Sequence, residues 1–193
     1  MGKITGTEPE QTTGFEDGIS EEDTYVCVVV EYQDLGEGEY GHQGILICQV
    51  DERHPNGKPK ETWVYFDHTT LGTEEKPSKI RQIANAIAGK PMPQSVAEGG
   101  FDPANLEGKC FRALLKNKST KKGRTVIAAE NFLSMRGADP IKIDWKAHEP
   151  WWEKKFNENH PMNPNNRSGN SASKQNDAAA EFLGDEDDDD NPW

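Results

Sequence analysis

The chain has 193 residues, of which 33% are hydrophobic, and its formal net charge is −12. This length fits one domain of ordinary size with tails, and the low hydrophobic content argues against a core that involves the whole chain. The charge is concentrated at the ends, with −6 over residues 1–24, +1 over 25–136 and −7 over 137–193, so the acidic total does not exclude nucleic acid as a ligand.

The first 23 residues are rich in Gly, Thr and Glu and lack apolar periodicity, which predicts a disordered N-terminal arm. The β-branched run over residues 25–32 then predicts a strand, and residues 34–41 read as a turn-rich connection. A second strand is predicted over 45–50. We expect one face of the first strand to carry Val26, Val28, Val30 and Tyr32.

An Asn-Gly pair within residues 54–58 predicts a tight turn, because this pair tolerates positive φ, and it joins the second strand to a third over 61–66. The period then changes: apolar residues at helical spacing predict a helix over 77–88 that ends at Gly89. Residues 90–105 read as a loop. Two further strands are predicted over 110–115 and 125–129.

Five short strands with one helix between the third and fourth predict a mainly β fold, an OB-like five-stranded barrel over residues 24–136. A split α+β sheet with the helix on one face is the alternative. Residues 137–156 are expected to be an aromatic and charged extension in which 150–156 make a helical turn or two. Whether this extension docks on the barrel, mediates homo-oligomer formation or stays mobile is left open. Residues 157–184 are rich in Asn, Ser, Pro and Gly, which is typical of a flexible linker.

Residues 109–124 contain seven basic residues and no acidic one. In an OB-type barrel the turn between the last two strands borders the oligonucleotide groove, so these side chains are candidates for phosphate contacts. A solvated lysine-rich turn is the alternative reading. The candidates are Lys109, Arg112, Lys116, Lys118, Lys121, Lys122 and Arg124.

Single strands also require rings on which bases stack. Trp63 and Tyr65 alternate along the third strand and therefore share one face, with Val64 and Phe66 on the other. If Val64 and Phe66 face the core, Trp63 and Tyr65 lie beside the groove; the opposite register buries them. The sequence alone leaves both registers open.

The chain ends in six consecutive acidic residues, a spacer, a proline and a terminal aromatic ring. Adjacent like charges stay solvated, and a terminal Trp beside a free carboxylate suits docking to a partner. A merely solubilising tail is the alternative. The candidate partner-binding residues are Asp185, Glu186, Asp187, Asp188, Asp189, Asp190 and Trp193.

This tip resembles the C-terminal tip of bacterial and bacteriophage single-stranded DNA-binding proteins, although Trp193 stands where Phe is usual and Asn191 where an aliphatic residue is usual. The resemblance implies a tail, residues 185–193, that recruits replication, repair and recombination proteins, such as a polymerase, helicase or primase. It also implies that the tail competes with DNA for the protein's own basic groove.

Residues 20–136 are similar to a group of phage-encoded OB-like proteins. The similarity rests on the early β-branched strand, the Trp-x-Tyr strand, the Ile-rich helix, the Leu-x-Gly-Lys segment at 106–109 and Asn-Phe-Leu at 131–133. It implies the OB-like fold and a bacteriophage setting.

The remaining patterns predict neither an enzyme nor a cofactor. The three cysteines and five histidines are scattered, so we expect buried reduced thiols and surface histidines rather than a metal site. No phosphate-binding loop, nucleophile elbow or His-Glu-x-x-His motif occurs. No apolar stretch predicts a signal peptide or a membrane span, so we expect a cytoplasmic protein, in the host cell if phage-encoded, without a membrane partner.

These features favour a non-enzymatic protein that coats single-stranded DNA in phage replication and recombination. Two alternatives remain: a protein-interaction or scaffolding factor whose acidic tail keeps it soluble, and a small DNA-processing nuclease. Salt dependence distinguishes the DNA-coating protein from the scaffolding factor, because Lys and Arg bound to DNA displace counterions from it. Metal-dependent loss of an oligonucleotide would indicate the nuclease.

Overall fold

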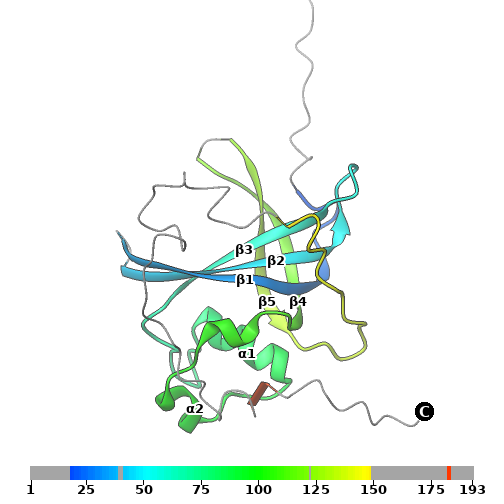
Figure 1. Cartoon of the computed structure of the whole chain (residues 1–193). Helices are drawn as coiled ribbons and strands as arrows, with labels where there is room; N and C mark the ends of the chain where they lie inside the picture. The colour runs from blue at the N-terminus through cyan, green and yellow to red at the C-terminus, as the bar shows by residue number, and fades with distance from the viewer. Residues whose placement is uncertain (1–17, 39–40, 122, 149–181, 184–193) are drawn as a thin grey trace, which may run out of the picture.

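The computed structural model describes residues 18–38, 41–121, 123–148 and 182–183. These residues form a mainly β fold with one principal helix (Figure 1). The elements in chain order are β1 (Thr24–Gly38), β2 (Gly41–Arg53), β3 (Pro59–Asp67), α1 (Lys79–Ala88), α2 (Gln94–Gly99), the 3-10 helix η1 (Pro103–Leu106), β4 (Cys110–Ser119) and β5 (Thr125–Leu133).

The five strands form one antiparallel sheet in the order β3-β2-β1-β4-β5. In a flat sheet the edge strands β3 and β5 would lie roughly 19 Å apart. Instead, the Thr62 hydroxyl on β3 donates a hydrogen bond of 2.9 Å to the Ile127 carbonyl on β5, so the sheet is strongly curled. The sheet is nevertheless not closed. The predicted barrel is wrong in this respect, because β3 and β5 remain edges that a side chain bridges in place of a backbone ladder.

The first strand is longer than predicted and changes face part-way. Its pairing with β2 shifts between Val29 and Glu31, which marks a β-bulge. Before the bulge, Cys27 and Val29 face the main core; after it, Tyr32 packs against that same core. The prediction that Tyr32 shares a face with Val26, Val28 and Val30 is therefore wrong, because the extra residue shifts the alternation by one.

The turn after β2 and the principal helix are confirmed. Gly57 adopts φ +83°, and the His54 amide donates to the Lys58 carbonyl at 2.8 Å across the turn. The Ser78 hydroxyl accepts from the Arg81 amide and caps α1, and Gly89 ends the helix in the left-handed conformation.

The segment predicted as a loop over residues 90–105 contains two short helical elements, α2 and η1. Their side chains enter the core through Val96 and Leu106, which are 4% and 0% exposed. Because each element is a single turn or little more, neither presents enough periodic apolar positions for recognition in the sequence.

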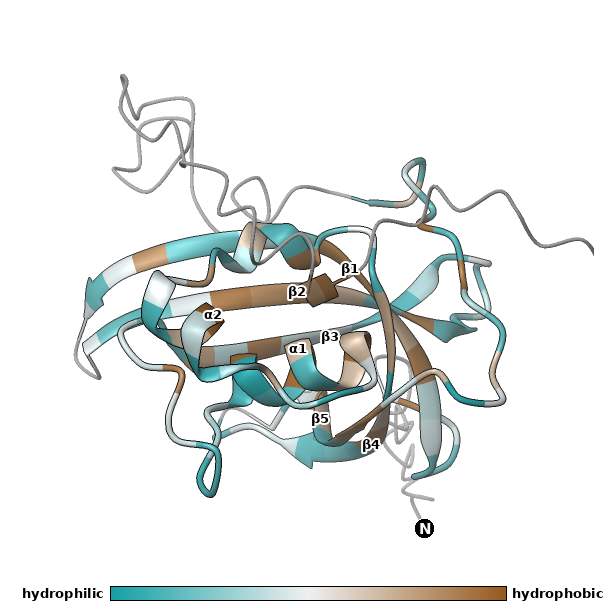
Figure 2. Ribbon diagram, turned by 90° about the horizontal axis from the view of Figure 1, so that it is seen from below, coloured by the Kyte–Doolittle hydropathy of each residue, from teal (hydrophilic) through white to brown (hydrophobic). Residues whose placement is uncertain are grey.

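Helices α1 and α2 lie together on one side of the strands, and the hydrophobic stretches of β1 and β2 run beside them in Figure 2. The Arg81 side chain is also buried there, at 1% exposure, and donates to the carbonyls of Gly72 and Met92. Gly72 has φ +67°, and a Cβ there would lie 2.3 Å from the Lys76 carbonyl oxygen. The 71–78 loop therefore requires glycine at this position.

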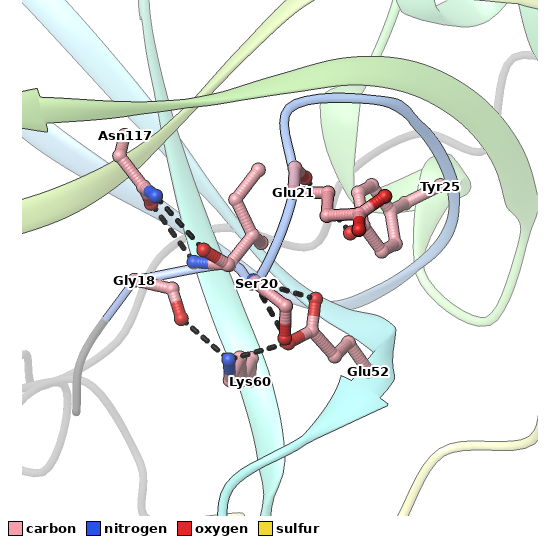
Figure 3. Close-up of polar contacts among 8 residues, drawn as sticks. Gly18, Ser20, Glu21, Tyr25, Glu52, Lys60 and Asn117 are labelled. Carbon is pink, nitrogen blue, oxygen red and sulfur yellow. Dashed lines mark hydrogen bonds and ion pairs between the residues drawn. The ribbon is translucent and has the colours of Figure 1, made fainter. Parts of the chain in front are cut away.

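Residues 18–23 belong to the folded unit, so the prediction of a disordered arm over 1–23 is wrong for its last six residues. Ile19 is fully buried, and the Asn117 side chain pairs with both its amide and its carbonyl at 2.8 Å (Figure 3). The buried Lys60 ammonium binds the Gly18 carbonyl and forms an ion pair of 2.5 Å with Glu52, which also accepts from Ser20. The rest of the predicted arm, residues 1–17, lies outside the described residues.

The extension after β5 also packs on the sheet, so the folded unit continues to residue 148 instead of ending at 136. Gln49 and Asp144 exchange two hydrogen bonds, of 2.7 and 3.2 Å, and Arg53 forms an ion pair of 3.1 Å with Asp144. His148 Nε2 lies 3.0 Å from the Glu31 carboxylate. The predicted helical turns over 150–156 lie outside the described residues.

The predicted linker over 157–184 includes two residues that the structure describes, Phe182 and Leu183. They are 4% and 9% exposed and belong to the main core cluster, and the Lys90 ammonium lies 5.9 Å from the centroid of the Phe182 ring. They lie on the same side of the sheet as α1 and α2 (Figure 1). The linker prediction is wrong for these two residues, because their side chains supply apolar surface to the core.

The three cysteines are free thiols. Cys27 and Cys48 are buried, and burial raises the pKa of both thiols well above the usual range. Cys110 is partly exposed, and its sulfur lies 3.4 Å from the Ile141 carbonyl oxygen.

Candidate nucleic-acid interface

The alternation along β3 decides between the two registers that the sequence left open. Thr62, Val64 and Phe66 are buried on the core side. Glu61, Trp63 and Tyr65 therefore occupy the outer face of the strand, where Tyr65 is 42% exposed and Trp63 half-buried. The register with Trp63 and Tyr65 outward is the correct one.

A groove of about 680 Å³ runs over the gap between the edge strands β3 and β5. Trp63 and Tyr65 form part of one wall, and Val126 and Ala128 part of the other. The turn before β3 and the turn before β5 supply polar residues to its lining. Its lining consists of His54, Lys58, Pro59, Glu61, Trp63, Tyr65, Thr120, Arg124, Thr125, Val126, Ile127, Ala128 and Ala147.

Trp63 is held in place from the sheet side. It stands opposite Ile47 in the β2–β3 register and packs against a second, smaller cluster of Ile45, Ile47 and Leu35 on the outer face. The indole thus combines a packed side with a side that lines the groove. A ring fixed in this way loses little rotamer freedom when a ligand stacks on it.

Tyr65 is the more exposed ring, and it carries no charge at neutral pH. Burial raises the pKa of its phenol above the ordinary value of 10.0. A neutral phenol beside a phosphate chain adds no repulsion and offers a hydroxyl donor. Tyr65 is therefore compatible with stacking or hydrogen bonding to a polyanionic strand.

The basic residues predicted from 109–124 do not form one site. Arg124 lines the groove, and Lys121 is exposed in the same β4–β5 turn. Lys116 and Lys118 instead form ion pairs of 3.1 and 2.7 Å with Glu130 on β5, and their hydrogen bonds lower the pKa of that carboxyl.

The other predicted bases lie away from the groove lining. Arg112 donates from Nε to the Ser134 carbonyl at 2.8 Å, and Lys109 is half-buried beside the β1 bulge, where its carbonyl accepts from the Val29 amide. Lys122 lies outside the described residues. Counting charges over residues 109–124 missed Glu130, which follows on β5. The antiparallel ladder pairs Glu130 with Leu114 and so brings its carboxylate within reach of Lys116 and Lys118.

Among the groove residues that the sequence did not single out are Lys58 and His54. Both belong to the Asn-Gly turn directly before the Trp-x-Tyr strand, so their placement beside Trp63 follows from that hairpin. Lys58 and Arg124 supply positive charge, and Glu61 places one carboxylate among them.

The predicted partner-binding residues Asp185, Glu186, Asp187, Asp188, Asp189, Asp190 and Trp193 lie outside the described residues. Two further aromatic rings belong to the interior: Phe111 is fully buried in the core, and Tyr32 stacks on Phe66 with ring centroids 6.2 Å apart. Of the two predicted sites, the structure therefore describes the groove and not the acidic tail.

No protein-family model matches the chain, and no curated protein matches it in sequence. The resemblances of the tail and the core to single-stranded DNA-binding proteins therefore stay predictions. Within the part of the chain that the structure describes, no helix has both the length and the apolar character needed to span a membrane.

Proposed function

We propose that this protein binds single-stranded nucleic acid along the β3–β5 groove and does not act as an enzyme. The observation that carries the proposal is the convergence of two outward aromatic rings, Trp63 and Tyr65, with two exposed cations, Lys58 and Arg124, in one open groove. Arg124 comes from the β4–β5 turn and the other three residues come from the β2–β3 hairpin, so two separate segments of the chain supply the groove.

The chemistry of such a groove suits unpaired bases. Each base has a π-face, and stacking on an aromatic side chain contributes roughly 1–3 kcal/mol per base. Lys58 and Arg124 both line the groove, where they would neutralise phosphates of a strand that stacks on Trp63 and Tyr65. Duplex DNA keeps its bases stacked internally, so the aromatic wall favours single strands.

The topology supports an OB-like assignment as part of this proposal. The sheet order places β1 between β2 and β4, the principal helix follows β3, and the curl brings β3 to β5. OB folds are partly open barrels that bind oligonucleotides over the β2–β3 face, beside the turn between the last two strands. The groove occupies the corresponding position, on the outer face of β3 beside the β4–β5 turn.

The sequence of the tail adds the second half of the proposal. Six acids followed by Asn-Pro-Trp suit recruitment of replication and recombination proteins, with Trp193 as the apolar anchor. A phage replication system is the setting that the tail and core resemblances imply. Single-stranded DNA is the proposed ligand.

A scaffolding role is the second candidate, and one observation favours it. Val126, 43% exposed, and Ala128 make the β5 wall of the groove apolar, and Glu61 opposes polyanions there. An extended peptide would pack against such an apolar wall as well as a nucleic-acid base would.

The test is binding of labelled oligo-dT, its duplex and the matching RNA by fluorescence anisotropy at several salt concentrations. The proposal requires preference for single-stranded DNA over the duplex and affinity that falls steeply with salt. Trp63→Ala should weaken binding about tenfold or more. Trp145→Ala is the matched control, because Trp145 is 65% exposed and is not part of the groove lining. Equal loss in both variants, or salt-independent affinity, would reject the groove as a nucleic-acid site.

A further inference from the structure

Three side chains of the types that ligate metals meet at the turn end of the β1–β2 hairpin, two from the hairpin itself and one from the end of β3. Asp34 lies on β1, His42 on β2, and His68 directly after β3. One nitrogen of each imidazole and one carboxylate oxygen of Asp34 all lie within 4.8 Å of one another. All three residues are partly buried.

Backbone pairing between the strands places the three residues close together. Asp34 pairs with Gly44 and Glu37 with His42 in the β1–β2 register, so Asp34 and His42 are near neighbours across the hairpin. Gln43 pairs with Asp67 in the β2–β3 register, and the His68 amide donates to the His42 carbonyl at 2.9 Å. The imidazoles of His42 and His68 therefore stack, with centroids 4.6 Å apart and planes 11° from parallel.

Two of the candidate ligands, Asp34 and His68, are also held by residues outside the trio. Asp34 Oδ1 lies 2.6 Å from His42 Nε2 and accepts from the Gly36 amide at 2.8 Å. Nε2 of His68 is hydrogen-bonded to the Tyr32 hydroxyl. Metal sites in proteins characteristically hold their ligands through such outer contacts.

We propose that Asp34, His42 and His68 bind a divalent transition-metal ion of the zinc type, with water completing the coordination. Two imidazoles and one carboxylate form a nitrogen-rich donor set, which suits Zn²⁺ and its neighbours, whereas Mg²⁺ and Ca²⁺ prefer oxygen ligands alone. Three protein ligands leave one position of a tetrahedral ion for solvent.

The fit requires side-chain rotation only. Around a tetrahedral ion with bonds of about 2.0–2.1 Å, ligand atoms lie roughly 3.4 Å apart. The Asp34–His42 contact would lengthen from 2.6 Å towards that spacing. One imidazole would also turn out of the stack, because two nearly parallel rings do not direct their lone pairs to one point. The backbone ladder that positions the three residues stays unchanged.

The bound ion would tie the distal end of the hairpin to the end of β3. Those segments are otherwise joined here by the β2–β3 ladder, the His68–His42 backbone hydrogen bond and the stacked rings. The proposal is independent of the groove, since none of the three residues lines it. The site escaped sequence analysis because its ligands come from three strand ends with no recognisable spacing.

The experiment is titration of the full-length protein with Zn²⁺ by calorimetry, with Mg²⁺ as the negative ion, beside thermal unfolding with and without Zn²⁺. The expected result is one Zn²⁺ per chain, no Mg²⁺ binding, and a higher unfolding midpoint with Zn²⁺. Asp34→Asn keeps the shape and the acceptor for the Gly36 amide, and it should weaken Zn²⁺ binding at least tenfold, as should His42→Gln.

His54→Gln is the matched control, because it removes one imidazole from a different turn and should leave Zn²⁺ affinity within about twofold of the native chain. His68→Gln is a third variant of the proposed site. If it does not fold, Asp34→Asn and His42→Gln decide whether the site binds Zn²⁺. The proposal is overturned if the native chain binds no Zn²⁺, or if Asp34→Asn and His42→Gln bind it as the native chain does.

Discussion

The Thr62 hydroxyl on β3 and the Ile127 carbonyl on β5 form a 2.9 Å hydrogen bond that joins the two edges of the sheet. Thr62 is fully buried and Ile127 nearly so. One side-chain contact thus stands where a closed barrel would have a backbone ladder, and the groove lies directly outside it.

Thr62→Val should destabilise the fold by about 1–3 kcal/mol, because the substitution keeps the shape but leaves a buried carbonyl without its donor. The measurement is the free energy of unfolding from urea denaturation. Ser95→Ala, which removes an exposed hydroxyl from α2, serves as control and should change stability by less than about 0.5 kcal/mol. Equal stability of Thr62→Val and the native chain would show that this bond does not hold the two edges together.

The Lys60–Glu52 ion pair should make stability depend on acid. Burial by itself raises the pKa of Glu52, but hydrogen bonds from Lys60, Ser20 and Tyr25 outweigh it and lower the pKa from 4.5 to about 2. The folded pKa lies below the unfolded one, so this contribution is complete above pH 4.5 and is lost as pH falls towards about 2.

Glu52→Gln should therefore cost about 3 kcal/mol at pH 7, because it leaves the Lys60 ammonium buried without its counter-ion. The variant should also show a shallower fall in stability between pH 5 and 2. Unfolding curves across that range provide the check. Parallel curves for the native chain and the variant would exclude Glu52 as a source of the acid dependence.

Arg124, which lines the groove, and Lys118, which forms an ion pair with Glu130, should differ in their effect on DNA binding. Arg124→Gln should weaken single-strand binding and reduce the slope of log affinity against log salt by about 0.7 for one lost phosphate contact. Lys118→Gln should change that slope less, because Glu130 already neutralises part of its charge. Anisotropy titrations at four salt concentrations measure both, and equal slopes for the two variants would contradict this division.

The acidic tip should compete with DNA for the groove. Deleting residues 185–193 should tighten single-strand binding, mainly at low salt, since a tethered polyanion loses its Coulomb advantage under screening. Removing Trp193 alone should leave DNA affinity nearly intact and abolish partner capture, because the ring is uncharged but would be the anchor. A deletion that alters neither DNA affinity nor capture of replication proteins would reduce the tail to a solubilising segment.

Much of the fold was predictable where local patterns decide it. The structure contains the Asn-Gly turn, the apolar stripe of α1 and the shared outer face of Trp63 and Tyr65. Each of these features depends on residues that are neighbours in sequence. The β1 bulge and the open edges were not predictable, because an inserted residue and a missing ladder depend on partners far along the chain.

The site shows the same division. Trp63 and Tyr65 belong to the groove as anticipated, whereas Lys116 and Lys118 do not, because strand register brings Glu130 to them. The grouping of Asp34, His42 and His68 depends on three strand ends at once, which no local pattern encodes.

The burial of Phe182 and Leu183 shortens the tether of the acidic tip. Trp193 is ten residues after Leu183, and ten fully extended residues span at most roughly 35 Å. While the two side chains stay packed, Trp193 therefore lies within that distance of the helical side of the fold. If they left the core, the limit would be counted from residue 148 and would be several times longer, so the packing of two apolar side chains limits how far Trp193 can lie from the fold.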